Sequence, residues 1–253
     1  KEQEPTMVLV PDTVNLPMQA CYELYQLTVA QCAKMQNRVA ILDVYDGYKD
    51  RDRKEEDVIE VFRALIGTEN LSYAAAYYPW LETDIVQDGS LTFKNLDVSV
   101  DLNLVLSEAA AKQLLAYFPK DAKEFKAAFK VQNPDVEEEM VAAALPAYIN
   151  NKERNFHLDL VATSPTYVSL LKEMRGMMNQ LPPSAAMAGV YTMVDNSRGV
   201  WKSPANVSIN SVIKPAVNIT HDEQESLNVD ALSGKSINAI RTFPGVGTMV
   251  WGG

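Results

Sequence analysis

The stretch RVAILDV, from Arg38 to Val44, decides the fold class of this 253-residue chain. Its apolar residues are nearly continuous, as in a strand of a parallel sheet that is buried on both faces. Before it, Met7–Val10 has the same character over a shorter run and stops at Pro11. Between the two, Pro17 suits the first turn of a helix that would extend to about Asn37. This part of the chain predicts strand, helix, strand.

The segments after Val44 repeat this alternation. The charged run KDRDRKEED (49–57) predicts a solvated loop and a helix start, because acidic residues are favourable in a first turn. Gly67 ends this helix, and its apolar face consists of Val58, Val61, Phe62 and Leu65. LSYAAAYYPW (71–80) then predicts a third strand that ends at Pro79. Strands that alternate with helices are typical of a parallel α/β sheet with right-handed crossovers.

A block from Asp84 to Thr163 interrupts this pattern. It first alternates, as in SLTFKNLDVSVDLNLVL (90–106), and then becomes helical. Ser107 is a candidate cap for one helix, and Asn133-Pro134 is the predicted start of another, which Pro146 should kink or stop. We interpret residues 84–163 as an inserted α+β subdomain. The core α/β domain then consists of residues 1–83 and 164–253, with a mostly parallel central sheet flanked by helices.

The core resumes with two predicted helices. Ser164 and Pro165 suit the cap and first turn of a helix to about Leu181, which Pro182-Pro183 ends. The next helix carries apolar residues at helical spacing, and Gly189 is predicted to let it pack close to a neighbour. Those apolar residues are Met187, Val190, Tyr191 and Val194. Gly199 suits a C-terminal cap, and Pro204 requires an extended exit.

The C-terminal part predicts a short helix and a hairpin. Thr220 and Glu223 form a capping box for a helix to about Leu227. INAIRTF (237–243) alternates as a strand, and TMVWG (248–252) is the returning strand. Pro244 and Gly245 fit the central positions of a type II turn between them.

Composition excludes several classes of partner. The net charge of −10 and pI of about 4.8 disfavour direct nucleic-acid binding. No apolar run reaches the roughly 18 residues of a membrane span. Cys21 and Cys32 lie on one predicted helix, roughly 16 Å apart, too far for a disulfide. We expect buried thiols in a reducing compartment.

A serine hydrolase is one hypothesis for the chemistry. Asp43 at a strand end and Ser184 at a helix start suggest two members of a catalytic triad. The two histidines, His157 and His221, lie outside the chain order and the glycine-flanked setting that such a triad needs. We therefore expect Ser184 to cap its helix or donate to a nearby carbonyl, and Ser184→Ala to cost about 0.5–2 kcal/mol. A bulky residue at Gly189 should cost more than about 1 kcal/mol through overpacking.

Other motifs give weaker indications. Gly234-Lys235-Ser236 ends like a P-loop, but Val229 stands where the motif needs a glycine, and a strand pattern follows. Gly245-x-Gly247 is too short for a dinucleotide fingerprint. Asp43 and Asp46 could pair, although loop acids are usually solvated. Two histidines and two distant cysteines make no metal site, so we predict no catalytic, cofactor or metal residues.

Four separated motifs occur in order along the chain. They are YYPW (77–80), PPSAAMAGVY (182–191), DNSRGVWKSPAN (195–206) and INAIRTFPGVGTMVWGG (237–253). Together they resemble the tail sheath proteins of contractile phage tails and of related bacterial injection systems. The resemblance covers the third predicted strand and the C-terminal third of the chain. The long block at 84–163 departs from the commonest family pattern, which has a much shorter loop there.

The resemblance implies a subtilisin-like core that is not a protease, and a structural role without enzyme activity or cofactor. Sheath subunits polymerise around an inner tube and contract to drive it through a target envelope. The implied partners are other sheath subunits, through strand-exchanging arms, the tube protein, and baseplate and terminator components. The implied location is the bacterial cytoplasm during assembly, then a phage or prophage virion tail or an injection particle. We expect the flanking family segments, including one or both arms, to be absent from this chain, which should then stay a monomer or small oligomer.

The motifs assign structural positions rather than catalytic ones. These positions are Tyr78, Pro79, Trp80, Pro182, Pro183, Ser184, Gly189, Asp195, Gly199, Trp201, Pro204, Asn238, Ile240, Arg241, Pro244, Gly245, Gly247, Trp251 and Gly252. Two alternatives stay open: a serine hydrolase on a subtilisin-like fold, and an adaptor that binds a partner through residues 84–163. Labelling by a fluorophosphonate would identify the first, and electron microscopy separates the sheath from the second. The inserted block is expected on the outer face of the assembly.

Overall fold

The computed structural model describes residues 4–51, 57–228, 230 and 233–252, so most of the charged run at 49–57 lies outside the described residues. The chain divides into two compact units. The core unit comprises residues 1–86 and 178–253, and the helical unit comprises residues 87–177. Each unit is described separately below.

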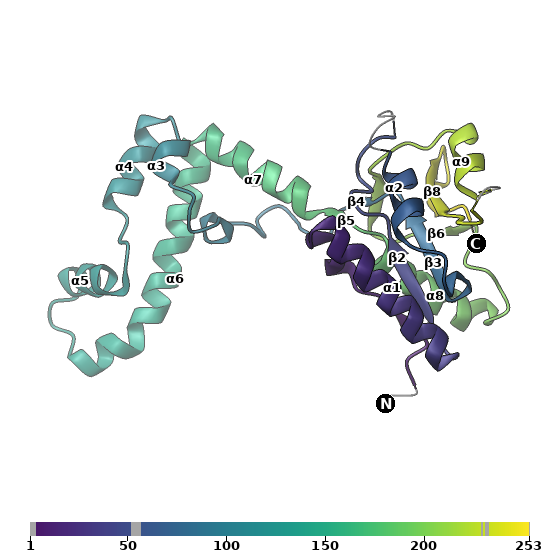
Figure 1. The fold of residues 1–253 in the computed structure, drawn as a ribbon. Coiled ribbons are helices and arrows are strands. Elements are labelled where there is room, and N and C mark those ends of the chain that lie inside the picture. Colours follow the sequence, from purple (N-terminus) through teal and green to yellow (C-terminus); the bar gives the residue numbers. More distant parts are fainter. Residues whose placement is uncertain (1–3, 52–56, 229, 231–232, 253) are drawn as a thin grey trace. The chain divides into compact units, whose positions relative to one another are not determined.

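The core unit is built on a six-stranded sheet with the order β1-β2-β3-β8-β9-β6 (Figure 1). Strands β1 (Met7–Val8), β2 (Val39–Asp43), β3 (Ala74–Tyr78) and β8 (Asn238–Phe243) pair in parallel. Strands β9 (Gly247–Val250) and β6 (Val207–Ser208) complete the sheet with antiparallel pairs. The predicted α/β class with a mostly parallel sheet is therefore confirmed.

Helices cover both faces of this sheet. One apolar cluster joins α1 (Met18–Met35), α2 (Val58–Leu65) and α9 (His221–Asn228) to one face. A second cluster joins α8 (Ser184–Arg198) to the other face. Alternate residues of β2 contribute to the two clusters, Leu42 to the first and Ile41 to the second. Asp43 shares its side of the strand with Ile41, so its carboxyl faces the α8 layer.

A second, three-stranded sheet lies where the chain leaves and re-enters the core unit. It consists of β4 (Leu81–Thr83), β5 (Gln180–Leu181) and β7 (Val212–Pro215), all antiparallel. Asn179 joins the two crossing segments, because its side chain accepts from the Val86 N–H at 2.8 Å and donates to the Val86 carbonyl at 2.9 Å. Its own carbonyl accepts from the Thr83 N–H at 2.8 Å.

Short 3₁₀ helices and five α-helices complete the chain. The 3₁₀ helices span Pro11–Asn15, Leu71–Tyr73 and Phe93–Asn95. The α-helices are α3 (Leu102–Val105), α4 (Ala109–Tyr117), α5 (Ala122–Gln132), α6 (Glu138–Thr163) and α7 (Pro165–Met178). The helical unit has its own core, formed by Leu106, Ala111, Phe156, Leu160 and Tyr167.

The β part of the predicted insertion is wrong, because the described residues 87–177 contain no strand. Two aspartates in the alternating stretch bind the local backbone instead: Asp97 accepts from the Ser99 N–H, and Asp101 from the Asn103 N–H. Such bonds favour turns and helix starts over strands. The apolar residues of the stretch pack on helices, as Phe93 does against Phe156 at 5.2 Å between ring centroids.

Two predicted helix starts in this unit are also wrong. The N-cap of α4 is Glu108 rather than Ser107. Helix α6 begins at Glu138, four residues after Pro134, and Lys126 and Lys130 of α5 both form ion pairs with Glu138 there. Pro146, which was predicted to kink or stop this helix, lies within α6 and does not stop it. Packing of buried residues along α6, from Val141 to Leu160, accounts for its continuity through the proline.

Helix α7 groups with the helical unit, whereas the sequence places the boundary at Thr163. Tyr167 of α7 is fully buried in the core of the helical unit. The predicted cap is confirmed, because the Tyr167 N–H donates to Ser164 Oγ at 3.1 Å. Glu108 accepts from the Thr166 N–H and from Ser164 Oγ, both at 2.9 Å. These bonds tie the start of α7 to the start of α4.

Most of the remaining local predictions are confirmed. Cys21 and Cys32 are free and buried in α1. The Thr220–Glu223 capping box is formed at α9, with Thr220 N–H to Glu223 Oε2 at 2.7 Å and Glu223 N–H to Thr220 Oγ1 at 3.3 Å. Gly245 has a φ of +76°, and the Val246 N–H donates to the Phe243 carbonyl, as the predicted turn requires. None of the described helices has the length and apolar character to cross a bilayer.

Candidate functional site in the core unit

Asp43 and Ser184 meet inside the core unit, as the hydrolase hypothesis would require of its acid and nucleophile. The contact, however, is a helix cap: the backbone N–H of Ser184 donates to Asp43 Oδ1 at 2.6 Å. Asp43 is 1% exposed and Ser184 is fully buried, so no cleft opens onto either side chain. Because Ser184 begins α8, the carboxyl lies at the positive end of that helix, where an anion is stabilised.

Burial determines the protonation of this junction. Removal from water raises the pKa of Asp43 to about 7, against the opposing effect of the bonds from Ser184. The Ser184 hydroxyl lies close enough to favour the ionised carboxylate, yet Oγ makes no hydrogen bond of good geometry within the described residues. The expected Ser184 side-chain cap is therefore wrong. The cap comes from Asp43, 141 residues earlier in the chain.

Neither histidine completes a triad. His157 belongs to the helical unit, where its Nδ1 and the Tyr167 hydroxyl are 3.0 Å apart. Burial lowers the pKa of His157. His221 is exposed at the first position of α9. Since Ser184 Oγ has no hydrogen-bond partner among the described residues, no imidazole is in place to accept its proton.

Two other ionisable side chains near Asp43, Cys21 and Tyr25, are kept in their neutral forms by burial. Burial raises the pKa of the Cys21 thiol to about 11, and the pKa of the Tyr25 phenol rises for the same reason. Both groups are neutral at physiological pH, and a neutral thiol is a poor nucleophile. The junction is thus a neutral or singly charged structural core.

The YYPW motif forms a corner at the end of β3. The Tyr78-Pro79 peptide bond is cis. Trp80 Nε1 donates to the Val44 carbonyl at 2.8 Å, and the Trp80 carbonyl accepts from the Ala216 N–H at 2.8 Å. A Cβ atom on Gly47 would lie only 2.7 Å from the Trp80 ring, so this turn requires glycine. The sequence did not indicate that Gly47 packs against the YYPW motif, although the DG pair at Asp46-Gly47 is typical of a turn.

In the motifs that form α8, Pro183 and Gly199 restrict the backbone at the two ends of the helix, whereas Gly189 in the middle has free space around it. Pro183 is buried at the N-terminus, and Gly199 ends the helix with a φ of +90°, donating to the Asp195 carbonyl at 3.1 Å. The predicted close packing at Gly189 is wrong, because a Cβ atom there would meet nothing within 4 Å. Close approach occurs at Gly199 instead, where a Cβ would lie 2.7 Å from the Trp201 indole nitrogen.

The C-terminal motif forms the β8–β9 hairpin. Ile240 is fully buried, and the Trp251 N–H donates to the Ala239 carbonyl at 2.8 Å. A Cβ on Gly252 would lie 3.0 Å from Asn238 Oδ1, which explains glycine at that position. Arg241 binds Gln224 of α9 and lies over the Phe243 ring. The remaining motif positions, Pro182, Pro204, Pro244 and Gly247, shape the chain at bends or strand ends.

Several apolar side chains within these motifs are exposed to solvent. Trp201 is 82% exposed and Val200 is 85% exposed, directly after the end of α8. Val246 at the tip of the hairpin is 60% exposed. An indole in water is unfavourable for an isolated domain, and exposed Trp and Tyr are enriched at protein interfaces.

The GKS motif has a structural role. Lys235 Nζ donates to the carbonyl of Arg63 near the C-terminus of α2, and the Arg63 guanidinium donates to the Lys235 carbonyl. The lysine is therefore committed to the protein backbone rather than to a phosphate. Asp46 pairs with Lys49 at the surface rather than with Asp43. The described residues contain no cluster of side chains that could hold a metal ion.

No protein-family model matches the chain, and no curated protein matches it. Solved structures of contractile injection systems do match parts of the chain. The sheath complex of an extracellular contractile injection system, PVC, in its contracted state is 49% identical over 29% of this chain and 20% of that chain, with a TM-score of 0.26. The contracted helical sheath of the anti-feeding prophage is 48% identical over 29% of this chain and 19% of that chain, with a TM-score of 0.26.

A third structure matches over more of the chain but less closely in sequence. The baseplate of the anti-feeding prophage is 20% identical over 92% of this chain and 34% of that chain, with a TM-score of 0.42. The present chain therefore spans between about a fifth and a third of the length of the chains that it matches.

Proposed function

We propose that this chain is a structural subunit of a contractile sheath, which polymerises around an inner tube, contracts and catalyses no reaction. The observation that carries the proposal is that the residues of the four motifs build structural features of the core unit. Their residues form a cis-proline corner, a helix with rigid ends and a packed hairpin, all in the core unit. Such a body can move rigidly while its surface contacts exchange.

The interior of the core unit supports a role without catalysis. Asp43 and Ser184 are buried and bonded to each other through the Ser184 backbone, without a histidine. Incubation with a fluorophosphonate should leave Ser184 unlabelled, while a serine protease in the same tube is labelled. Labelling that Ser184→Ala abolishes would establish the hydrolase alternative instead.

The proposed partners are further sheath subunits, the tube protein, and baseplate and terminator components. The matched structures are sheath and baseplate assemblies, and Trp201 of the third motif is exposed. We place the working location in a virion tail or an injection-system particle, after assembly in the bacterial cytoplasm.

Electron microscopy of the full-length protein, co-expressed with its tube protein, tests this function. Hollow tubes or stacked rings are expected, and Trp201→Ala should reduce their number without changing the fold. Leu27→Ala is the matched control, because Leu27 is 67% exposed on α1, outside the four motifs. Protein that stays dispersed in the presence of tube protein contradicts the proposal.

A further inference from the structure

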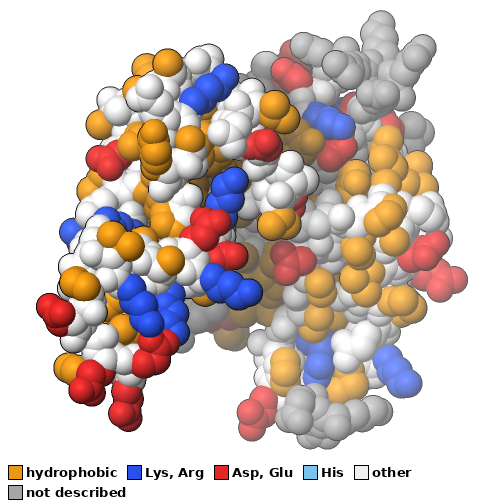
Figure 2. Space-filling view, turned by 90° about the vertical axis from the view of Figure 1, so that its left-hand side faces the viewer, with side chains coloured by type: hydrophobic (Ala, Val, Ile, Leu, Met, Phe, Trp, Pro, Cys, Tyr) orange, Lys and Arg blue, Asp and Glu red, His pale blue; other side chains and the backbone are white. Residues whose placement is uncertain are grey.

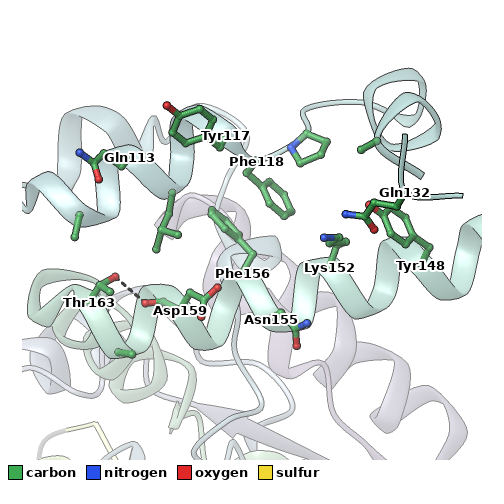
Figure 3. Close-up of a pocket in the computed structure, with 15 residues that line it drawn as sticks. Gln113, Tyr117, Phe118, Gln132, Tyr148, Lys152, Asn155, Phe156, Asp159 and Thr163 are labelled. Atoms are coloured by element: carbon green, nitrogen blue, oxygen red, sulfur yellow. Dashed lines mark hydrogen bonds between the residues drawn. The ribbon is translucent and has the colours of Figure 1, made fainter. Parts of the chain in front are cut away.

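The helical unit contains an open groove of about 910 Å³ that the proposed function does not use. Helix α6 supplies one side of the groove, from Tyr148 to Thr163, and α4 and α5 supply the others (Figure 3). Tyr148 and Thr163 are fifteen residues apart, and at a helical rise of 1.5 Å per residue this stretch of α6 is about 22 Å long. Hydrophobic side chains lie between charged ones on the exposed face of this unit (Figure 2). We call this feature the α6 groove.

The middle of the α6 groove is apolar. The rings of Phe118 and Phe156 stack at 3.8 Å between centroids with an interplanar angle of 17°. Tyr148 and Lys152 lie to one side of this pair, and Asp159 and Thr163 to the other (Figure 3). Tyr117, on the α4 side, is 88% exposed although it is a large aromatic residue. A helix that presents apolar residues to the groove would cover Tyr117 and the exposed part of Phe118, whereas Phe156 is already buried beneath them.

The two charges of the α6 groove have no partners of opposite sign. Neither Lys152 nor Asp159 forms an ion pair with any described residue. The Lys152 ammonium instead lies 5.4 Å from the Tyr148 ring centroid. Seven residues separate the two charges, which is nearly two turns and about 10 Å along one side of α6. The groove thus presents a cation and an anion at a helical spacing.

We propose that the α6 groove binds an amphipathic helix of another protein, which carries one acidic and one basic residue seven positions apart beside its apolar stripe. A helix is about 10 Å wide, and four turns match the length of the groove. The acid pairs with Lys152 and the base with Asp159, so the charges fix the register while Tyr117 and Phe118 supply apolar contact. The inference rests on the helical unit alone and holds whether or not the chain polymerises.

The other helices of this chain do not fit the groove. Among the described helices, only α6 itself carries an acid and a base seven residues apart. Its own pair, Lys152 and Asp159, lines the groove itself, between the α4 and α5 sides. The partner helix is therefore sought in a different protein.

Three labelled helical peptides of about fifteen residues test the proposal against the full 253-residue chain. They share one apolar stripe and differ at two positions seven apart, with Glu and Arg, Glu and Glu, or Arg and Arg. Fluorescence anisotropy should give the Glu/Arg peptide about five-fold tighter binding than either other peptide. Lys152→Glu should transfer the preference to the Arg/Arg peptide, and Asp159→Lys to the Glu/Glu peptide.

Arg154→Glu is the matched control, because Arg154 is an exposed residue of α6 that does not line the groove. It should leave the Glu/Arg preference unchanged, and circular dichroism should show all three variants folded. Equal binding of the three peptides, binding of none at about 1 mM, or a preference that Lys152→Glu does not alter would overturn the proposal. A dimer seen by sedimentation and lost in Lys152→Glu would assign the groove to a second copy and overturn it too.

Discussion

Two helices in this protein begin at a carboxylate from a distant part of the chain. In the core unit, Asp43 accepts the Ser184 N–H at the start of α8. In the helical unit, Glu108 accepts the Thr166 N–H and the Ser164 hydroxyl at the start of α7. Burial raises the pKa of Asp43 to about 7, whereas the bond from the Thr166 N–H lowers the pKa of Glu108 to about 2.

The difference between them is access to water. Glu108 stays solvated, so the hydrogen bonds to its charged form dominate. Asp43 is 1% exposed, so the loss of hydration outweighs a bond of 2.6 Å. The same contact therefore makes stability depend on pH with opposite signs in the two units. The units can be followed separately, because all three tryptophans, Trp80, Trp201 and Trp251, lie in the core unit.

The largest expected effect is the pH dependence of the core unit. Asp43 titrates near its ordinary value of 3.8 when unfolded and near 7 when folded. Its stabilising contribution is fully present below pH 3.8 and is lost as pH rises to about 7, by up to about 4 kcal/mol. Denaturation followed by tryptophan fluorescence should show this decline. Asp43→Asn should remove it, and a decline unchanged in Asp43→Asn would show that another group is responsible.

The second effect is the loss of stability when the buried hydrogen bond between the Ser184 N–H and Asp43 is removed. Asp43→Ala leaves the Ser184 N–H buried without its acceptor and should lower the free energy of unfolding by about 1–3 kcal/mol at pH 5. Glu108→Ala is the comparison, and water can replace its lost bonds, so its effect on the helical unit should be smaller. Urea denaturation at one pH measures both. A larger loss in Glu108→Ala would contradict the role given to burial.

The third effect concerns the serine of the α7 cap. Ser164 Oγ accepts the Tyr167 N–H at 3.1 Å, so Ser164→Ala should destabilise the helical unit by about 0.5–2 kcal/mol. Thermal unfolding followed by far-ultraviolet circular dichroism measures this change. Ser164→Asp, which retains an N-cap acceptor, should recover part of the loss unless Glu108 repels it.

The fourth effect is a pH dependence of opposite sign in the helical unit. The pKa of Glu108 lies at about 2 when folded and near 4.5 when unfolded. Its contribution is present above pH 4.5 and is lost as pH falls toward 2, and surface solvation keeps it small. The protection factors of α7 amides in hydrogen exchange, which correct for the intrinsic pH dependence of the exchange rate, should fall over this range in the wild type and not in Glu108→Gln. An equal fall in both would exclude Glu108 as the cause.

The smallest expected effect is at Ser184. Its backbone, rather than its hydroxyl, makes the cap, so Ser184→Ala should change the free energy of unfolding by less than about 0.5 kcal/mol. Tryptophan fluorescence in urea again provides the measurement. A loss above about 1 kcal/mol would show that Oγ holds a bond in solution.

Local signals in the sequence located most elements of the core unit. Pro17, Gly67 and the Thr220–Glu223 box act within a few residues of their own backbone, so their effects can be read without a fold. The alternating stretch at 90–106 was wrongly predicted as a strand, because the prediction considered only local residues. An alternating pattern becomes a strand only if another strand pairs with it, and here Asp97 and Asp101 bind their own backbone instead.

The sequence predicted which residues form the candidate site but not how they contact each other. The sequence singled out Asp43 and Ser184 as a pair, and the fold does bring them together, but as an acceptor and a backbone donor. The motif glycines were predicted to be structural, but the sequence did not show which of them lies against a neighbouring side chain. Gly199 meets Trp201, while Gly189 faces open space.

The sequence by itself determined where most elements of the core unit start and stop and that the sheet is largely parallel, because these depend on backbone geometry and on runs of apolar residues. Only the tertiary structure decided which elements meet: Asp43 with α8, α7 with the helical unit, and the facing sides of the α6 groove. The physical reason is that burial and long-range hydrogen bonds arise between residues far apart in the chain, and no local pattern encodes how much water each carboxylate loses.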